Sequence, residues 1–90
     1  MVFLNIKMEN EKKILAQSFK MKNGTLDDDY TLFDNGEVLH EYDRSIYPGG
    51  FNLKRTLKPT ELTESVKQRL LSEARDEDKQ MVMKFLEIDI

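Results

Sequence analysis

The stretch YTLFDNGEVLHEYD, residues 30–43, decides the fold of this 90-residue chain, because it has the pattern of a β-hairpin closed by Asn35-Gly36. Two runs of β-favouring residues, YTLF and VLHEY, flank the turn. Asn and Gly most readily take the positive φ that tight hairpin turns require. The sequence therefore predicts two antiparallel strands here.

The turn can be built in two ways, and the choice decides which side chains face the core. A two-residue loop of Asn35-Gly36 pairs Phe33 with Val38. A three-residue loop of residues 34–36, with a bulge at Gly36, pairs Leu32 with Val38 instead and so reverses the faces. We favour the bulged form, because it gathers the longer alternating set on one face: Tyr30, Leu32, Val38, His40 and Tyr42.

Composition indicates one small soluble domain spanning residues 1–90. The chain is 39% hydrophobic and 34% charged, which favours a globular fold with a thin core over disorder. It has no cysteine, and this excludes disulfides, thiolate catalysis and sulfur-ligated zinc or iron. No apolar run has the length of a signal-peptide core or a membrane span, so we expect a cytoplasmic protein with no membrane partner.

The segments before the hairpin give weaker signals. Alternation over residues 2–8 is typical of a strand, although residues 1–12 could equally be a loose N-terminal segment. Residues 13–22 favour a strand over a helix, because their helical stripe is poor. Residues 23–29 contain three adjacent aspartates, so we expect a connecting loop.

The segments after the hairpin predict an edge strand and helices. Residues 51–57 are expected to be partly extended, with cations that discourage edge-to-edge pairing. Pro59 and the threonines and glutamates after it are typical of a helix start. Apolar stripes then predict one helix with Leu62, Val66 and Leu70 inside, and a second from Asp76. The second helix is expected to bury Met81, Val82, Phe85 and Leu86. One long helix remains an alternative.

These elements together predict an α+β domain. Residues 13–58 supply an antiparallel meander sheet of three to four strands with its loops, and residues 59–90 supply two C-terminal helices. A sheet with one apolar face needs a cover, and the two helices are the candidates for it.

No motif of catalysis or cofactor binding is found. His40, the only histidine, has no carboxylate orienter beside it on its face of the strand, since Glu41 points to the opposite face. The serines lack a nucleophile motif, and Asp27, Asp28 and Asp29 do not fit a calcium loop. We therefore expect no enzyme activity, no cofactor and no metal site.

The one compositional hint of a binding surface lies in residues 42–58. This stretch carries a local charge of +3 in a chain of net charge −3 and combines aromatic with cationic side chains. Such residues dominate both protein interfaces and single-stranded nucleic-acid sites. The best-supported hypothesis is a small non-enzymatic interaction or regulatory module that binds a protein or a second copy of itself. A weak single-stranded nucleic-acid binder is the alternative. The candidate residues are Tyr42, Arg44, Tyr47, Phe51, Lys54 and Arg55.

Overall fold

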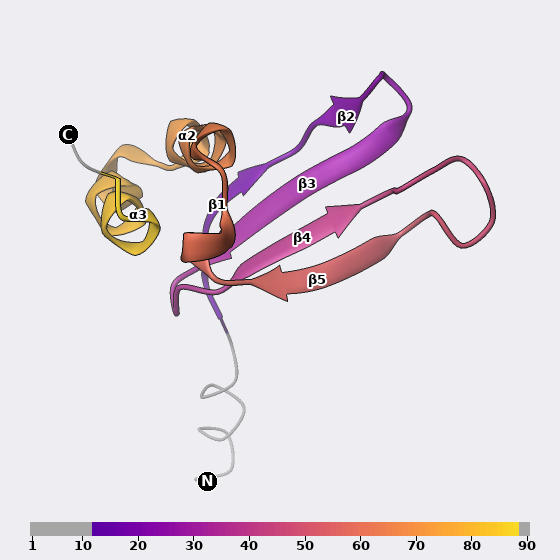
Figure 1. The fold of residues 1–90 in the computed structure, drawn as a ribbon. Coiled ribbons are helices and arrows are strands. Elements are labelled where there is room, and N and C mark those ends of the chain that lie inside the picture. Colours follow the sequence, from indigo (N-terminus) through magenta and orange to yellow (C-terminus); the bar gives the residue numbers. More distant parts are fainter. Residues whose placement is uncertain (1–11, 89–90) are drawn as a thin grey trace, which may run out of the picture.

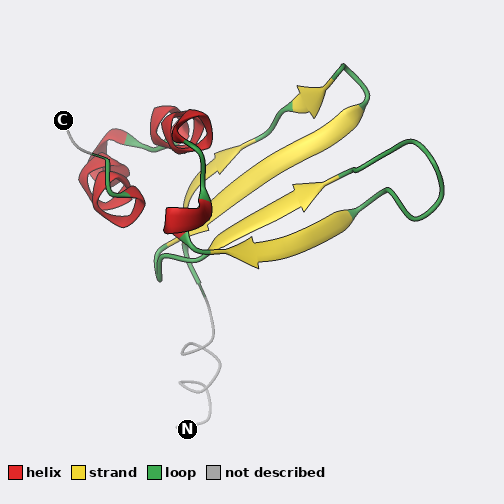
Figure 2. Ribbon diagram, viewed as in Figure 1, coloured by secondary structure: helices red, strands yellow, loops and turns green. Residues whose placement is uncertain are grey.

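The computed structural model describes residues 12–88, in which an antiparallel sheet packs against two helices (Figure 1). The strands are β1 (Ile14–Ser18), β2 (Met21–Lys22), β3 (Leu26–Phe33), β4 (Val38–Tyr42) and β5 (Leu53–Leu57). The 3-10 helix η1 (Pro59–Glu61) precedes α2 (Glu64–Glu73), and η2 (Asp76–Asp78) precedes α3 (Lys79–Leu86). The predicted α+β fold is confirmed (Figure 2), with five strands and two separate helices. The strand expected over residues 2–8 lies outside the described residues.

The sheet has the order β1-β3-β4-β5, and β2 pairs with β3 beyond the end of β1. The predicted strand over residues 13–22 is thus two short strands separated at Phe19 and Lys20. The loop predicted over residues 23–29 is confined to residues 23–25, because β3 begins at Leu26 and includes all three aspartates. Alternation places Asp28 on the opposite face from its two neighbours, where Arg69 and His40 contact it, so the charges do not accumulate on one side.

The hairpin turn has the bulged form that we favoured. Leu32 pairs with Val38, and the Gly36 N–H donates to the carbonyl of Phe33 at 3.0 Å. Gly36 has a φ of +89°, whereas Asn35 stays outside the positive-φ region. The side chain of Asn35 instead accepts the N–H of Glu37 at 3.0 Å, so this asparagine stabilises the turn locally.

The core lies between the helices and one face of the sheet. Its fully buried side chains come from both layers: Leu32, Val38, Leu70, Val82 and Leu86. Thr63 caps α2 by accepting the N–H of Val66 at 3.3 Å, which aims the predicted stripe at the sheet. The burial predicted for Met81 is wrong, since its side chain is 48% exposed and the inner face of α3 runs through Val82 and Leu86.

The helices cover only one end of the sheet. In Figure 1 they lie beside that end, while the loop between β4 and β5 extends from the opposite end. Helix α2 contacts β1 and β3, and α3 contacts α2 and η1. The far end of the sheet is therefore left without a helical cover. In residues 12–88 no helix is long and apolar enough to cross a membrane.

Candidate interaction site

A buried polar network centred on Asp28 joins α2 to the sheet. Its Oδ1 lies 2.7 Å from Nε2 of His40, and its Oδ2 accepts a hydrogen bond from Nη1 of Arg69 at 3.2 Å. Arg69 also donates from Nη2 to the backbone carbonyl of Asp28 at 2.8 Å and from Nε to the hydroxyl of Ser18 at 2.9 Å. One side chain of α2 therefore holds both β1 and β3.

His40 is fixed by its neighbours on all sides. Its Nδ1 accepts a hydrogen bond from Nε of Arg55 at 3.2 Å, so the neutral ring carries its proton on Nε2 and donates it to Asp28. The ring stacks between Tyr30, with centroids 4.2 Å apart, and Tyr42, at 4.4 Å. The residue is only 4% exposed. Both nitrogens and both ring faces are occupied, which leaves no position for a substrate.

The charges of this network follow from its burial. Burial lowers the pKa of His40 below its ordinary 6.5, and the positive charges of Arg55 and Lys22 lower it further, against the opposing effect of Asp28. Burial raises the pKa of Asp28, but the hydrogen bond from His40, the charge of Lys22 and the contact with Arg69 together hold it below 3.8. At neutral pH the network thus contains a neutral imidazole and an ionised carboxylate.

This network was missed by sequence reasoning, which found no carboxylate partner for His40. The signal was present in the hairpin register: the bulged form places Tyr30 opposite His40, and Asp28 lies two residues before Tyr30 on the same face. No comparable signal marks Arg69, which reaches the sheet only through the packing of α2.

The loop between β4 and β5 is held in shape by Asp43. Its carboxylate accepts the backbone N–H of Asp27 at 3.0 Å and that of Asn52 at 2.8 Å, and these two bonds keep its pKa below the ordinary 3.8. The N–H of Gly50 donates to the carbonyl of Tyr47 at 3.0 Å. Hydrogen bonds thus define the base and the tip of the loop.

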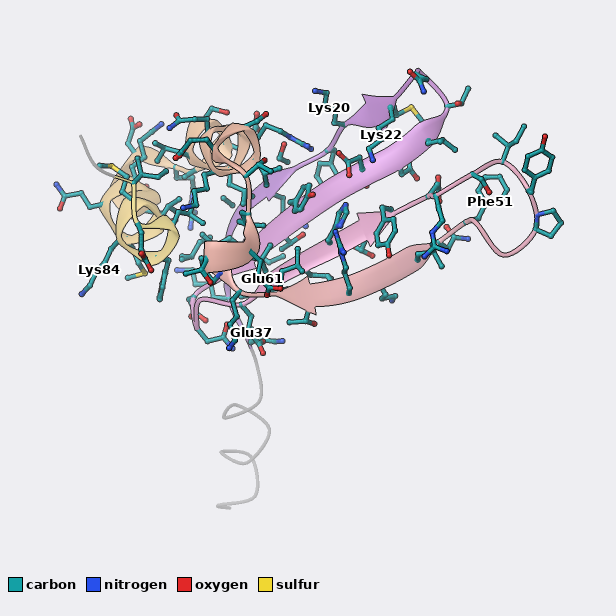
Figure 3. The ribbon with its side chains drawn as sticks, viewed as in Figure 1. Lys20, Lys22, Glu37, Phe51, Glu61 and Lys84 are labelled. Carbon is teal, nitrogen blue, oxygen red and sulfur yellow. The ribbon has the colours of Figure 1, made fainter. Side chains whose placement is uncertain are left out.

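This ordered loop exposes three large apolar side chains. Ile46 is 62% exposed, Tyr47 70% and Phe51 46%, and Figure 3 shows Phe51 on the loop away from the helices. Three such side chains on one loop add exposed apolar area at this end of the sheet. We call Ile46, Tyr47 and Phe51 the loop tip.

The six predicted site residues do not form one surface. Arg44, Tyr47 and Phe51 belong to the loop. Tyr42 and Arg55 lie on the helix-facing side of the sheet, where the guanidinium carbon of Arg55 is 5.3 Å from the centroid of Tyr42. Lys54 lies on the opposite side, paired with Glu41. Lys54 and Arg55 belong to β5, Tyr42 pairs with its first residue, Leu53, and the other three residues lie in the loop that precedes it.

The outer edge of β5 is open in the described part of the chain. Just outside the two ends of β4, Glu37 and Asp43 hydrogen-bond to β3. The odd-numbered residues of β4 therefore bond to β3, and the even-numbered ones bond to β5, where they are paired with odd-numbered residues. The N–H and C=O groups of Lys54 and Thr56 therefore point away from the sheet. Among residues 12–88 these four groups have no hydrogen-bond partner, and both side chains are exposed.

A hollow of about 480 Å³ lies on the side of the sheet opposite the helices. Asp27, Asp29, Glu41 and Asp43 contribute to its lining. Within residues 12–88 no three acidic, histidine or cysteine side chains come together in a way that could hold a metal ion. The residues that line the hollow thus give this side of the sheet an acidic surface, but in the described part of the chain they do not form a metal site.

Comparison of the chain with known protein families, with curated proteins and with solved structures finds no match. The geometry of β5 and its surroundings is the remaining basis for inferring a function.

Proposed function

We propose that this chain is a protein-interaction module that binds an extended segment of a partner protein by strand addition to β5. The supporting observation is the open edge, where the backbone groups of Lys54 and Thr56 point outward on exposed residues. An unpaired edge of this kind is a template for an added strand, and main-chain hydrogen bonds supply much of the affinity. Non-enzymatic function stays a prediction.

Charge favours a different protein over a second copy of this chain. The β5 sequence LKRTL contains two cations and no acid. If two copies paired antiparallel about Arg55, the two arginines would lie directly opposite each other, and like charges in that arrangement are destabilising. A strand with an acid opposite Arg55 would instead be attracted. Lys54 and Arg55 therefore disfavour pairing with a second copy and favour a partner strand that carries an acid.

Side-chain alternation specifies the partner further. Leu53 and Leu57 are half-buried on the helix-facing side, with Arg55 between them. Paired residues on neighbouring strands share a face, so we expect apolar partner residues opposite the two leucines. Beyond the end of β5, the loop tip offers apolar area to the residues that flank the added strand.

Fluorescence anisotropy with a labelled peptide tests this proposal. The probe carries Val-Thr-Glu-Thr-Val between Gly-Ser segments. Thr56→Pro removes the outward N–H without breaking a bond to β4, so the variant should fold and lose binding. Thr56→Val is the matched control and should bind like the wild type. Absence of binding to the wild-type chain, or equal binding by the proline variant, overturns strand addition.

Single-stranded nucleic acid is the second candidate. Tyr47 and Phe51 are exposed and available for stacking. Tyr42, however, already stacks on His40 and lies beside Arg55, and the acidic hollow borders Lys54, where it would repel phosphates. A labelled oligonucleotide in the same assay distinguishes the two ligands, because its affinity would fall steeply with salt.

A further inference from the structure

Arg55 differs from the other cations around β5 because two residues of β4 fix the orientation of its side chain. Its Nε is committed to Nδ1 of His40, and its guanidinium carbon lies 5.3 Å from the centre of the Tyr42 ring. In residues 12–88 its two terminal nitrogens make no hydrogen bond or ion pair, and the residue is exposed. A guanidinium held in this way presents free donors in one fixed geometry.

That geometry fits a carboxylate. Two terminal N–H groups in a plane match the two oxygens of a carboxylate, and the pair gains strength when the guanidinium is held in place beforehand. Lys54 lacks both properties, since its ammonium is a point charge and no described residue orients it.

Arg55 also occupies the position on β5 that an added strand would meet most closely. Its backbone groups bond to β4, so the residue opposite it on an added antiparallel strand forms a non-hydrogen-bonded pair, in which side chains approach closest. Both side chains of that pair lie on the helix-facing side. A glutamate there would place its carboxylate on the same face of the sheet as the guanidinium.

We propose that Arg55 is the specificity-determining residue of the β5 edge, that it binds a glutamate at the centre of the partner's strand, and that His40 is its positioning residue. This inference rests on the proposed strand addition and names the chemistry that selects the partner. The expected partner motif is apolar-x-Glu-x-apolar, with the glutamate opposite Arg55 and the apolar residues opposite Leu53 and Leu57.

The positioning role makes binding sensitive to protonation of His40. A protonated ring carries hydrogen on both nitrogens, so Nδ1 can no longer accept from Arg55, and two positive groups then face each other. The charged and titratable groups that surround this ring are Lys22 of β2, Asp28 and Tyr30 of β3, Tyr42 of β4, Arg55 of β5 and, through Asp28, Arg69 of α2. Of these, Arg55 is the one that an added strand would contact.

The test compares two peptides and three proteins by anisotropy. The probes are the Val-Thr-Glu-Thr-Val peptide and its Val-Thr-Gln-Thr-Val counterpart. The wild-type chain should bind the glutamate peptide about three- to tenfold more tightly. Arg55→Gln should bind both peptides equally and weakly. If the wild-type chain binds neither peptide, strand addition and this inference both fail. If it binds both with equal affinity, strand addition stands and the carboxylate site is overturned.

His40→Gln separates positioning from a merely structural role. Its amide can accept from Arg55 and donate to Asp28 but does not titrate. The wild-type chain should lose affinity for the glutamate peptide as the pH falls below about 6.5 and His40 becomes protonated, since the pKa of His40 lies below that value. The glutamine variant should bind more weakly at the upper pH, because it loses the stacking on Tyr30 and Tyr42, but it should show a smaller loss of affinity as the pH falls. Equal pH dependence in both proteins overturns the role of His40.

Discussion

Arg69 of α2 donates two hydrogen bonds to Asp28 of β3, from Nη1 to Oδ2 at 3.2 Å and from Nη2 to the backbone carbonyl at 2.8 Å. The two side chains are only 16% and 11% exposed. A buried ion pair of this kind adds little over an apolar pair of the same shape, but the loss of one partner leaves an uncompensated charge.

Arg69→Met should therefore lower the free energy of unfolding by about 3 kcal/mol. The double variant Arg69→Met with Asp28→Leu should recover part of this loss, because no lone carboxylate remains. Urea denaturation of the two single variants and the double variant completes the cycle. Strictly additive losses would mean that the contact does not couple α2 to the sheet.

Stability should also fall as the pH is lowered through the range in which His40 titrates. The pKa of His40 in the folded chain lies below 6.5, so below about pH 6.5 the unfolded chain binds this proton more readily and the free energy of unfolding decreases. A second loss should begin below about pH 3.8, where protonation of Asp28 and Asp43 removes the stability that their lowered pKa values supply.

Denaturation midpoints measured from about pH 8 to about pH 5 check the first of these losses. His40→Gln is the matched control, since its amide can accept from Arg55 and donate to Asp28 but does not titrate. This variant should show a nearly constant midpoint over that range, and a slope equal to that of the wild-type chain would assign the pH dependence to other groups.

The strands and helices could be predicted where one periodicity dominates the sequence. The hairpin at Gly36 and the stripe through Val66 and Leu70 are local patterns, and both are confirmed. Residues 27–29 could not be assigned to a strand from the sequence, because three adjacent like charges disfavour a strand unless residues from elsewhere in the chain pair with them. For Asp28 that partner is Arg69, 41 residues away, and no local pattern shows it.

The candidate site was predicted in composition but not in arrangement. Residues 42–58 do carry the open edge and the loop tip, yet the polar network beneath Arg55 depends on register and on helix packing. Sequence periodicity identifies which face of a strand a residue occupies, whereas contacts between strands require the register to be known.

Leu70 should be the most sensitive position of α2. Its side chain is fully buried between the helix and the sheet, so Leu70→Ala should lower the free energy of unfolding by about 3 kcal/mol through lost burial and a residual cavity. Gln68→Ala on the exposed side of the same helix is the control and should change stability by less than about 0.5 kcal/mol. Similar small effects at both positions in chemical denaturation would contradict the packing of α2 on the sheet.

Gly36 should be the most position-specific residue of the hairpin. Its φ of +89° strains any residue with a side chain, and an added β-carbon would lie 3.2 Å from Cδ1 and Cε1 of Phe85 on α3. Gly36→Val should therefore destabilise the fold by about 2 kcal/mol, because the valine disturbs both the turn and the contact with α3. Thermal melts of the two chains measure the loss.

Asn35→Val provides the comparison within the same turn. Since Asn35 does not have a positive φ in the bulged form, valine loses only the two local hydrogen bonds to Glu37 and should cost less than Gly36→Val. Gly50 cannot serve as a control position that tolerates valine, because a β-carbon there would lie 2.8 Å from the backbone oxygen of Ser45. If valine were tolerated equally at positions 35 and 36, the bulged turn and its contact with Phe85 would both be wrong, and the register that places His40 beside Arg55 would have to be reassigned.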